Sequence, residues 1–134
     1  MTLTIRVIAP DRMVWNAEAE EVVLPSSTGQ LGILKGHIPL LTALDIGVMR
    51  VRINKDWIPI VLLGGFAEVE NDKITILVNG AEEVSEINFQ EAKKNLETAT
   101  SILKTAENNK EKIEATQQIR KARARLQAIG TQKD

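Results

Sequence analysis

The 134-residue chain contains no cysteine, a single histidine and no long uncharged apolar run. Without cysteine it forms no disulfide framework and has no thiol chemistry. Because His37 is the only histidine, a cysteine/histidine zinc site or a histidine-based triad lacks its residues, so we expect no metal, no cofactor and no catalytic residue. The longest charge-free apolar stretch, residues 57–67, is far shorter than the roughly 20 residues of a membrane-spanning helix. The N-terminus lacks the apolar region of a signal peptide, and we expect a protein that is not exported.

The charge of the chain is distributed unevenly. Residues 1–87 carry 7 Lys and Arg and 12 Asp and Glu, a net charge of −5, whereas residues 88–134 carry 10 and 6, a net charge of +4. Such a change of sign indicates two modules with different partners.

Residues 1–87 have the pattern of β-strands. Apolar and polar residues alternate in "LTIRVIA" and "GVMRVRIN", and "WIPIVLLGG" and "KITILVNG" are further β-rich runs. The short polar segments Asn54–Asp56 and Asn71–Asp72 separate such runs and predict hairpin turns. Strands at this spacing favour a β-sandwich or a barrel.

From Phe89 onward the apolar residues follow a helical period. Two segments, separated by a polar stretch, each show a heptad pattern. Asn108-Asn109 is predicted to form the turn between them. We therefore predict an α+β fold: an N-terminal β-sandwich domain, residues 1–87, followed by a C-terminal antiparallel two-helix hairpin, residues 88–134. The predicted seam positions are Phe89, Ala92, Leu96, Ala99, Leu103 and Ala106 in the first helix and Ala115, Ile119, Ala122, Leu126 and Ile129 in the second.

The many alanines at the seam bear on how firmly the two helices hold together. Both segments are rich in strong helix formers. An Ala/Leu seam, however, buries less apolar surface than a Leu/Leu seam, at roughly 0.8 kcal/mol per buried CH₂. The composition fits a hairpin that can open, and a permanently closed helical arm fits it equally well.

Two other segments hold candidate site residues. In "TGQLGILKGHIPLL", residues 28–41, the glycine spacing matches no phosphate-binding motif. We therefore expect loop glycines that supply a positive φ or a close backbone approach, and a structural His37. Glu82, Glu83 and Glu86 form an acidic cluster before the first helix. Acid–base or cation-binding roles are conceivable, but a solvated approach to the positive helix N-terminus explains the cluster more simply.

The end of the second helix is strongly basic. Arg120, Lys121, Arg123 and Arg125 lie within six positions, and no acidic residue occurs between Glu114 and Asp134. Complementing the helix dipole accounts for one or two of these charges. The segment lacks the interleaved aromatic residues of a nucleic-acid site, and the chain as a whole is not basic, so we expect an acidic protein surface as the partner rather than nucleic acid.

The motifs "GQLGILKGHIPLL" and "GGFAEVEN", followed by a two-helix tail, resemble those of the ε subunits of F-type ATP synthases. "VWN" and "RINKDW" look most like the chloroplast and cyanobacterial branch. The resemblance covers nearly the whole chain. It implies a non-catalytic rotor component of the central stalk, with the γ subunit, the c-ring and the β subunit as partners. It also implies a peripheral position at the thylakoid membrane, on the stromal side in a chloroplast or the cytoplasmic side in a cyanobacterium.

The resemblance further assigns roles to individual residues. Gly29, Gln30, Leu31 and Gly32 correspond to a loop that faces the c-ring, and Ala9 and His37 to positions near γ. Arg120, Lys121, Arg123 and Arg125 correspond to a basic stretch that meets an acidic loop of the β subunit. In the family the helices rise to the catalytic head and restrain ATP hydrolysis. The alternative is a passive structural adaptor of the stalk with a permanently closed arm.

One motif departs from that of some bacterial relatives, which bind ATP through Ile-Asp-x-x-Arg-Ala at the start of the first helix. The corresponding stretch here is "INFQEA", residues 87–92, where Asn88 replaces the acid and Glu91 replaces the arginine. Because this change reverses the charge that faces a phosphate, we predict no useful ATP binding by the chain alone.

Overall fold

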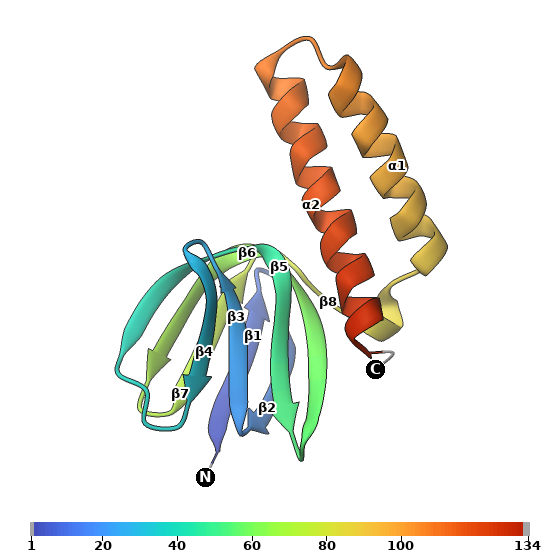
Figure 1. Ribbon diagram of the computed structural model, residues 1–134. Helices are drawn as coiled ribbons and strands as arrows, with labels where there is room; N and C mark the ends of the chain where they lie inside the picture. The colour runs from blue at the N-terminus through green and yellow to red at the C-terminus, as the bar shows by residue number, and fades with distance from the viewer. Residues whose placement is uncertain (1, 133–134) are drawn as a thin grey trace.

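The computed structural model describes residues 2–132, and its N-terminal part is one mixed sheet that curls into a β-sandwich (Figure 1). The strand order is β2-β1-β7-β6-β5-β3-β4, with β8 paired to β6. Neighbouring strands are antiparallel except β1 and β7, which are parallel. The strands are β1 (Leu3–Ala9), β2 (Arg12–Ala19), β3 (Glu21–Ser26), β4 (Gly29–Leu34), β5 (Leu40–Ile53), β6 (Asp56–Glu70), β7 (Lys73–Val78) and β8 (Ala81–Glu83).

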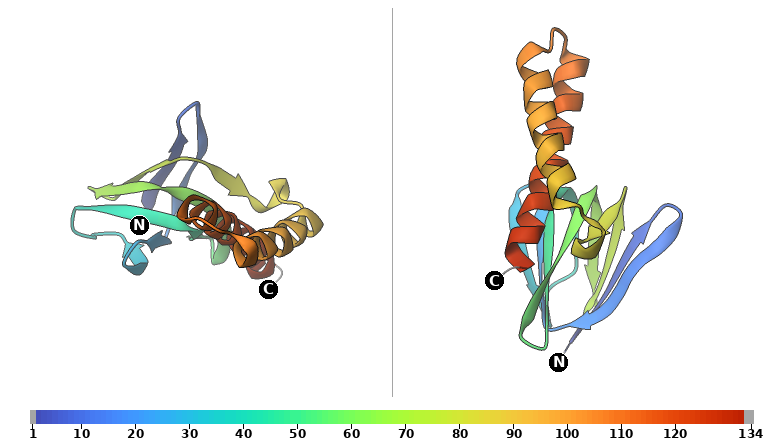
Figure 2. Two further views of the ribbon diagram at one scale, coloured as in Figure 1. Left: turned by 90° about the horizontal axis from the view of Figure 1, so that it is seen from above. Right: turned by 90° about the vertical axis from the view of Figure 1, so that its right-hand side faces the viewer.

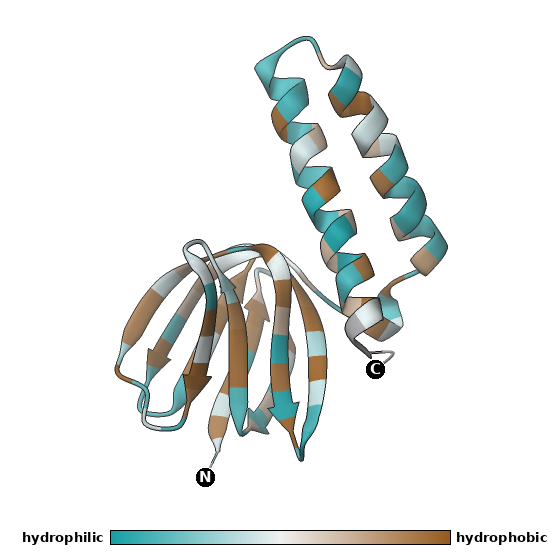
Figure 3. Ribbon diagram, in the orientation of Figure 1, coloured by the Kyte–Doolittle hydropathy of each residue, from teal (hydrophilic) through white to brown (hydrophobic). Residues whose placement is uncertain are grey.

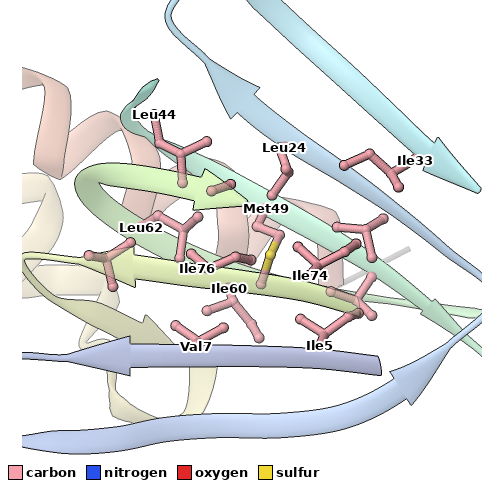
Figure 4. Packing of buried hydrophobic residues seen from close by; sticks show 14 of the residues in the cluster. Ile5, Val7, Leu24, Ile33, Leu44, Met49, Ile60, Leu62, Ile74 and Ile76 are labelled. Carbon is pink, nitrogen blue, oxygen red and sulfur yellow. The ribbon is translucent and has the colours of Figure 1, made fainter. Parts of the chain in front are cut away.

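Alternating side chains account for the two faces of the sheet. In β1 the residues at positions 3, 5, 7 and 9 are buried, and those between them are partly or fully exposed. The inward side chains of both layers form a single apolar core (Figure 4). Among them are the fully buried Ile5, Leu24, Met49, Ile60 and Ile76. The β-sandwich predicted from the alternation is confirmed.

The two predicted hairpin turns are present. Asn54 and Lys55 have φ of 51° and 75°, and Asn71 and Asp72 have φ of 51° and 61°. Two consecutive residues with positive φ form the tight turn whose twist matches that of the adjoining strands. Both turns are closed by residues of paired strands, Ile53 with Asp56 and Glu70 with Lys73.

The long strands β5 and β6 belong to both layers of the sandwich. Their pairing is interrupted between Leu44–Gly65 and Ile46–Leu63, where the pair of strands bends from one layer to the other. Gly64 and Gly65 there have φ of 85° and 150°. A Cβ atom at Gly65 would lie 2.0 Å from the carbonyl oxygen of Leu77, so only glycine fits this bend.

A short 3₁₀ helix, η1 (Val84–Glu86), leads from β8 to two antiparallel helices, α1 (Phe89–Thr105) and α2 (Asn109–Gln132) (Figure 2). Asn88 caps α1, because its side-chain oxygen accepts a hydrogen bond from the Glu91 N–H at 2.9 Å. Asn108 accepts equivalently from the Glu111 N–H at 2.9 Å. The predicted turn at Asn108-Asn109 therefore lies slightly too late in the chain, because residues 106–108 form the connection and Asn109 already begins α2.

The helices pack on each other mainly through small side chains. Ala92 and Ala99 of α1 are buried, as are Ala115, Ile119 and Ala122 of α2. Figure 3 shows single apolar residues spread along both helices among many polar ones. The α+β fold and the antiparallel hairpin predicted from the heptad pattern are confirmed.

Candidate functional site

The candidate sites of the described residues, 2–132, are exposed surfaces and the contacts between the sandwich and the helices. Within this range no group of three His, Asp or Glu residues is placed to hold a metal ion. No helix there has both the length and the apolar character needed to cross a membrane.

An apolar row crosses the outer face of one sheet layer. Met13 of β2 lies opposite Ile8 of β1, Ile8 opposite Leu77 of β7, Leu77 opposite Phe66 of β6, and Phe66 opposite Ala43 of β5. At the spacing of adjacent strands the row extends roughly 19 Å. Met13, Leu77 and Phe66 are each at least half exposed, at 50%, 53% and 57%. Large apolar side chains exposed in one contiguous row are typical of a surface that another protein covers.

A hollow of about 510 Å³ adjoins this apolar row. It is lined by Ile8, Ala9, Pro10, Phe66 and Leu77, among others. Ala9, one of the two residues implied to lie near γ, thus borders the hollow, although its own side chain points into the sandwich and is only 8% exposed.

His37, the other residue implied to lie near γ, is held in the loop between β4 and β5. Its Nδ1 atom is 2.7 Å from the Ile38 carbonyl oxygen, and its backbone N–H donates to the Leu34 carbonyl at 3.1 Å. The neighbouring Gly36 N–H donates to Asp72 Oδ1 at 2.7 Å, which ties this loop to the turn between β6 and β7. His37 therefore lies near the start of β7, whereas Ala9 lies near its end.

The segment implied to be a c-ring-facing loop is instead an edge strand, β4. Gly29, Gln30, Leu31 and Gly32 pair with β3, because Gly29 adopts a φ of 125° and closes a tight hairpin. Gly29 thus has a positive φ, as expected, whereas Gly32 does not, and the expected loop is a strand. Gln30 is exposed, and its Oε1 accepts a hydrogen bond from Arg50 Nη2 at 3.0 Å. Gly29 and Gly32 are also exposed, and Leu31 is half-buried.

Helix α2 attaches to the sandwich by a second set of alanines. Ala124 and Ala128 pack against Val48 of β5 and Val61 of β6, on the outer face of the other sheet layer. Sequence analysis missed this contact, although the spacing of these two alanines, one turn apart and off the predicted seam, was a signal for it. Figure 1 shows that α1 and the N-terminal half of α2 extend beyond the sandwich, so the attachment is confined to the C-terminal half of α2.

The four basic residues of α2 do not share one environment. Arg120 and Arg123 are exposed to solvent. Lys121 is half-buried and lines a cavity of about 450 Å³ between α2 and the sandwich, together with Asp45 and Asn79. Arg125 is half-buried and paired. The basic cluster that is continuous in the sequence is therefore divided between solvent and the sandwich.

Arg125 forms a bidentate ion pair with Glu82 of β8. Arg125 Nε and Nη2 each donate to one Glu82 carboxylate oxygen at 2.7 Å. The two side chains are only 23% and 24% exposed. Hydrogen bonding to Glu82 raises the pKa of Arg125 above its ordinary value, burial opposes the rise, and the charges of Glu82 and Glu91 add to it. Charge-assisted bidentate pairs of this geometry are among the stronger polar contacts in proteins.

The acidic cluster before α1 thus has structural partners. Besides the Glu82 pair with Arg125, Glu86 accepts a hydrogen bond from the Glu83 backbone N–H at 3.1 Å and caps η1. Glu82, Glu86 and Glu91 line a polar cleft of about 190 Å³, together with Asn88 and Arg125. Carboxylates outnumber the single guanidinium, so the cleft is a poor host for a phosphate group.

Two family models together match almost the whole chain. Residues 2–84 match the β-sandwich domain of the ATP synthase delta/epsilon chain, and residues 85–130 match its long α-helix domain.

Curated relatives are similar over nearly their full lengths. The chloroplastic ATP synthase epsilon chain of Gracilaria tenuistipitata var. liui is 77% identical over 128 residues, which cover 96% of this chain and 96% of the relative. That of Pyropia yezoensis is 75% identical over the same length and coverage. The ATP synthase epsilon chain of the Trichodesmium erythraeum strain IMS101 is 60% identical over 133 residues, 97% of each chain.

Among solved structures, a chain in the cryo-EM structure of the Euglena gracilis mitochondrial ATP synthase, OSCP/F1/c-ring in rotational state 1, superimposes with a TM-score of 0.83. It is 20% identical, and the match covers 95% of this chain and 80% of that one. At this identity the likeness concerns the fold.

Proposed function

The chain belongs to the ATP synthase delta/epsilon family and is a non-catalytic epsilon subunit of the central stalk of an F-type ATP synthase, and we propose that it couples the c-ring to the γ subunit and restrains ATP hydrolysis through its C-terminal helices. The sandwich would dock on the stalk, and the helices would act on the catalytic head. The two modules, residues 1–87 and 88–134, would thus have separate tasks.

Docking on γ is assigned to the apolar row Met13–Ile8–Leu77–Phe66–Ala43 and the hollow beside it. Met13, Leu77 and Phe66 each expose about half of their surface to water. Burying this apolar surface against a partner would contribute roughly 25 cal/mol per Å² to the free energy of binding. Ala9 would contact γ from the rim of the hollow, and His37 from the loop at the other end of the same layer.

Docking on the c-ring is assigned to the β3–β4 hairpin, with Gly29, Gln30, Leu31 and Gly32. Support comes from the exposure of Gln30 and the two glycines, whose backbone a partner can approach closely. The edge position of β4 leaves one side of that strand without a partner strand among the described residues.

Restraint of hydrolysis is assigned to the helical hairpin. The observation that carries it is the narrow attachment of α2, in which Ala124 and Ala128 are the buried helix side chains in the apolar contact with the sandwich. Two helices of roughly 20 residues placed end to end reach about 60 Å at 1.5 Å per residue. Arg120, Lys121, Arg123 and Arg125 would then meet an acidic loop of the β subunit, with charge steering the encounter.

A passive adaptor is the second candidate, and the bidentate pair between Arg125 and Glu82 favours it, because this contact holds the arm in its folded position. In that case the arm would never rise, and regulation would not depend on residues 88–134.

The membrane position is a proposal as well. Chloroplastic and cyanobacterial relatives of high identity support a peripheral subunit, which would lie on the thylakoid membrane at the stromal or cytoplasmic side.

ATP hydrolysis by a complex of α, β and γ subunits tests the proposal. Full-length chain should lower the rate, whereas a chain truncated after Ile87 should bind γ equally well and leave hydrolysis high. Equal inhibition by both chains would remove the regulatory role from the helices and leave the passive adaptor.

A further inference from the structure

Within residues 2–132 two ion pairs occur, and only one of them connects the helices to the sandwich. Arg52 and Glu21 pair within the sheet at 3.3 Å through a single contact. Arg125 and Glu82 join α2 to β8 through two contacts of 2.7 Å. We name the second the interdomain ion pair.

The interdomain ion pair lies beside the apolar contact between α2 and the sandwich. The apolar contact beside it is made by Ala124 and Ala128 against Val48 and Val61, and the partly buried Ile46, Leu63, Val84 and Ile87 pack around it. Glu86 and Glu91 line the same cleft as Glu82, and the charge of Glu91 adds to the attraction on Arg125. The hairpin therefore cannot rise without breaking this ion pair as well as the apolar contact.

Arg125 cannot serve two acidic partners at once. Its Nε–Nη2 edge, the edge suited to bidentate binding, is taken up by Glu82, and its side chain is only 23% exposed. An acidic surface outside the molecule can reach this edge only after α2 has left the sandwich. Arg120 and Arg123, by contrast, are already exposed in the folded position.

We propose that the interdomain ion pair holds the hairpin in its folded position, and that Arg125 exchanges Glu82 for an acidic protein surface when the hairpin rises. This inference rests on the proposed regulatory function and adds to it a competition between Glu82 and an acidic protein surface for Arg125. Glu82 stabilises the folded form alone, whereas Arg125 contributes to both forms. Removing Glu82 should therefore favour the raised form, and removing Arg125 should weaken both.

The absence of cysteine from the chain allows a direct test on the full-length protein. Val61 is fully buried beneath α2, so the thiol of a Val61→Cys variant reacts with a disulfide reagent only when the helix departs. In that background Glu82→Gln should raise the labelling rate about fivefold, the size expected for a partly buried bidentate pair. Raising the salt concentration should accelerate labelling of the parent and have less effect on Glu82→Gln.

Two controls make the result specific. Glu21→Gln removes the other ion pair, which joins two strands of the sandwich rather than the sandwich and the helices. This variant should leave labelling at position 61 unchanged. A Met49→Cys variant reports opening of the sandwich core, and Glu82→Gln should not accelerate its labelling. If Glu82→Gln leaves the labelling rate of Val61→Cys unchanged, the inference is overturned. Equal acceleration of labelling at positions 49 and 61 would also overturn it, because it would indicate a general loss of stability.

Inhibition of the assembled α/β/γ complex separates this inference from the proposed function. The Glu82→Gln variant should inhibit ATP hydrolysis at about fivefold lower concentration than the native chain. The double variant Glu82→Arg with Arg125→Glu exchanges the two charges, so its thiol labelling should be slower than that of Arg125→Glu alone. This double variant should still inhibit only weakly. Faster labelling without any change in inhibition would uphold the ion pair as the restraint and refute the regulatory function. Unchanged labelling, with inhibition still lost on truncation after Ile87, would refute the ion pair alone.

Discussion

Val48 and Val61 lie opposite each other on β5 and β6, and α2 covers both with Ala124 and Ala128. Val61 and Ala128 are completely buried, whereas the side chains at the far end of the hairpin, such as Ile113, are exposed. The helix is thus attached at one end only, and its close approach depends on alanine.

Replacing Ala128 by leucine should separate α2 from the sandwich without unfolding either part. The added methylene groups have no space at a fully buried position, and overpacking of this kind costs about 1–3 kcal/mol. In NMR spectra the methyl signals of Val48 and Val61 should shift, and those of Ile5 and Met49 should not. Gln118→Leu, an exposed position on the same helix, is the control and should leave all four unchanged.

Replacing Phe66 by glutamate should weaken binding to γ at least tenfold, because the substitution places a charge in the middle of the apolar row. The melting temperature should change little, since the side chain is 57% exposed. The matched control is Ile113→Glu at the free end of the hairpin, where the native side chain is 58% exposed. Equal loss of γ binding in both variants would contradict the assignment of the apolar row.

Replacing Gly65 by alanine should destabilise the sandwich by roughly 3 kcal/mol or more, because the new Cβ collides with the Leu77 carbonyl and the backbone φ disfavours a side chain. Chemical denaturation measures this loss. Gly32→Ala is the control, since its Cβ would meet no atom within 4 Å and its φ is not in the left-handed region. A loss of stability in Gly32→Ala as large as that in Gly65→Ala would refute the steric explanation.

Reversing the two exposed charges, Arg120→Glu with Arg123→Glu, should weaken inhibition of ATP hydrolysis severalfold while thiol labelling at position 61 stays unchanged, because neither side chain is buried against the sandwich. Lys93→Glu with Lys94→Glu makes the same change of charge on exposed positions of α1 and should inhibit normally. In the Glu82→Gln background, where the interdomain ion pair no longer opposes the raised form, inhibition should also fall as salt rises. Salt-independent inhibition in that background would argue against electrostatic docking.

Calorimetry of the isolated chain should detect no ATP binding with a dissociation constant below the millimolar range, because three carboxylates line the cleft at the start of α1. The variant Asn88→Asp with Glu91→Arg restores the motif of the ATP-binding relatives and should bind more tightly than the native chain, with the α1 cap retained. Sub-millimolar binding by the native chain would contradict this prediction.

The β-strands and the two helices could be predicted because each depends on neighbours in the sequence. Alternation places Leu3, Ile5 and Val7 on one face whatever lies opposite, and heptad spacing marks Ala92 and Ala99 in the same way. The prediction of a loop at residues 29–32 was wrong for a related reason. A glycine-rich segment has a weak local preference, and pairing with β3 decided its conformation.

The sequence by itself determined the two modules, the β-sandwich and the helical pair, the change of net charge between them and the family to which the chain belongs, since all of these follow from local periodicity, composition and motif. Only the tertiary structure decided that Arg125 faces Glu82, that Ala124 and Ala128 cover the sheet, and that Met13, Ile8, Leu77 and Phe66 join in one row. The physical reason is that these relations join residues far apart in the chain. Strand order and helix docking minimise the free energy of the whole molecule, and no segment carries that information alone.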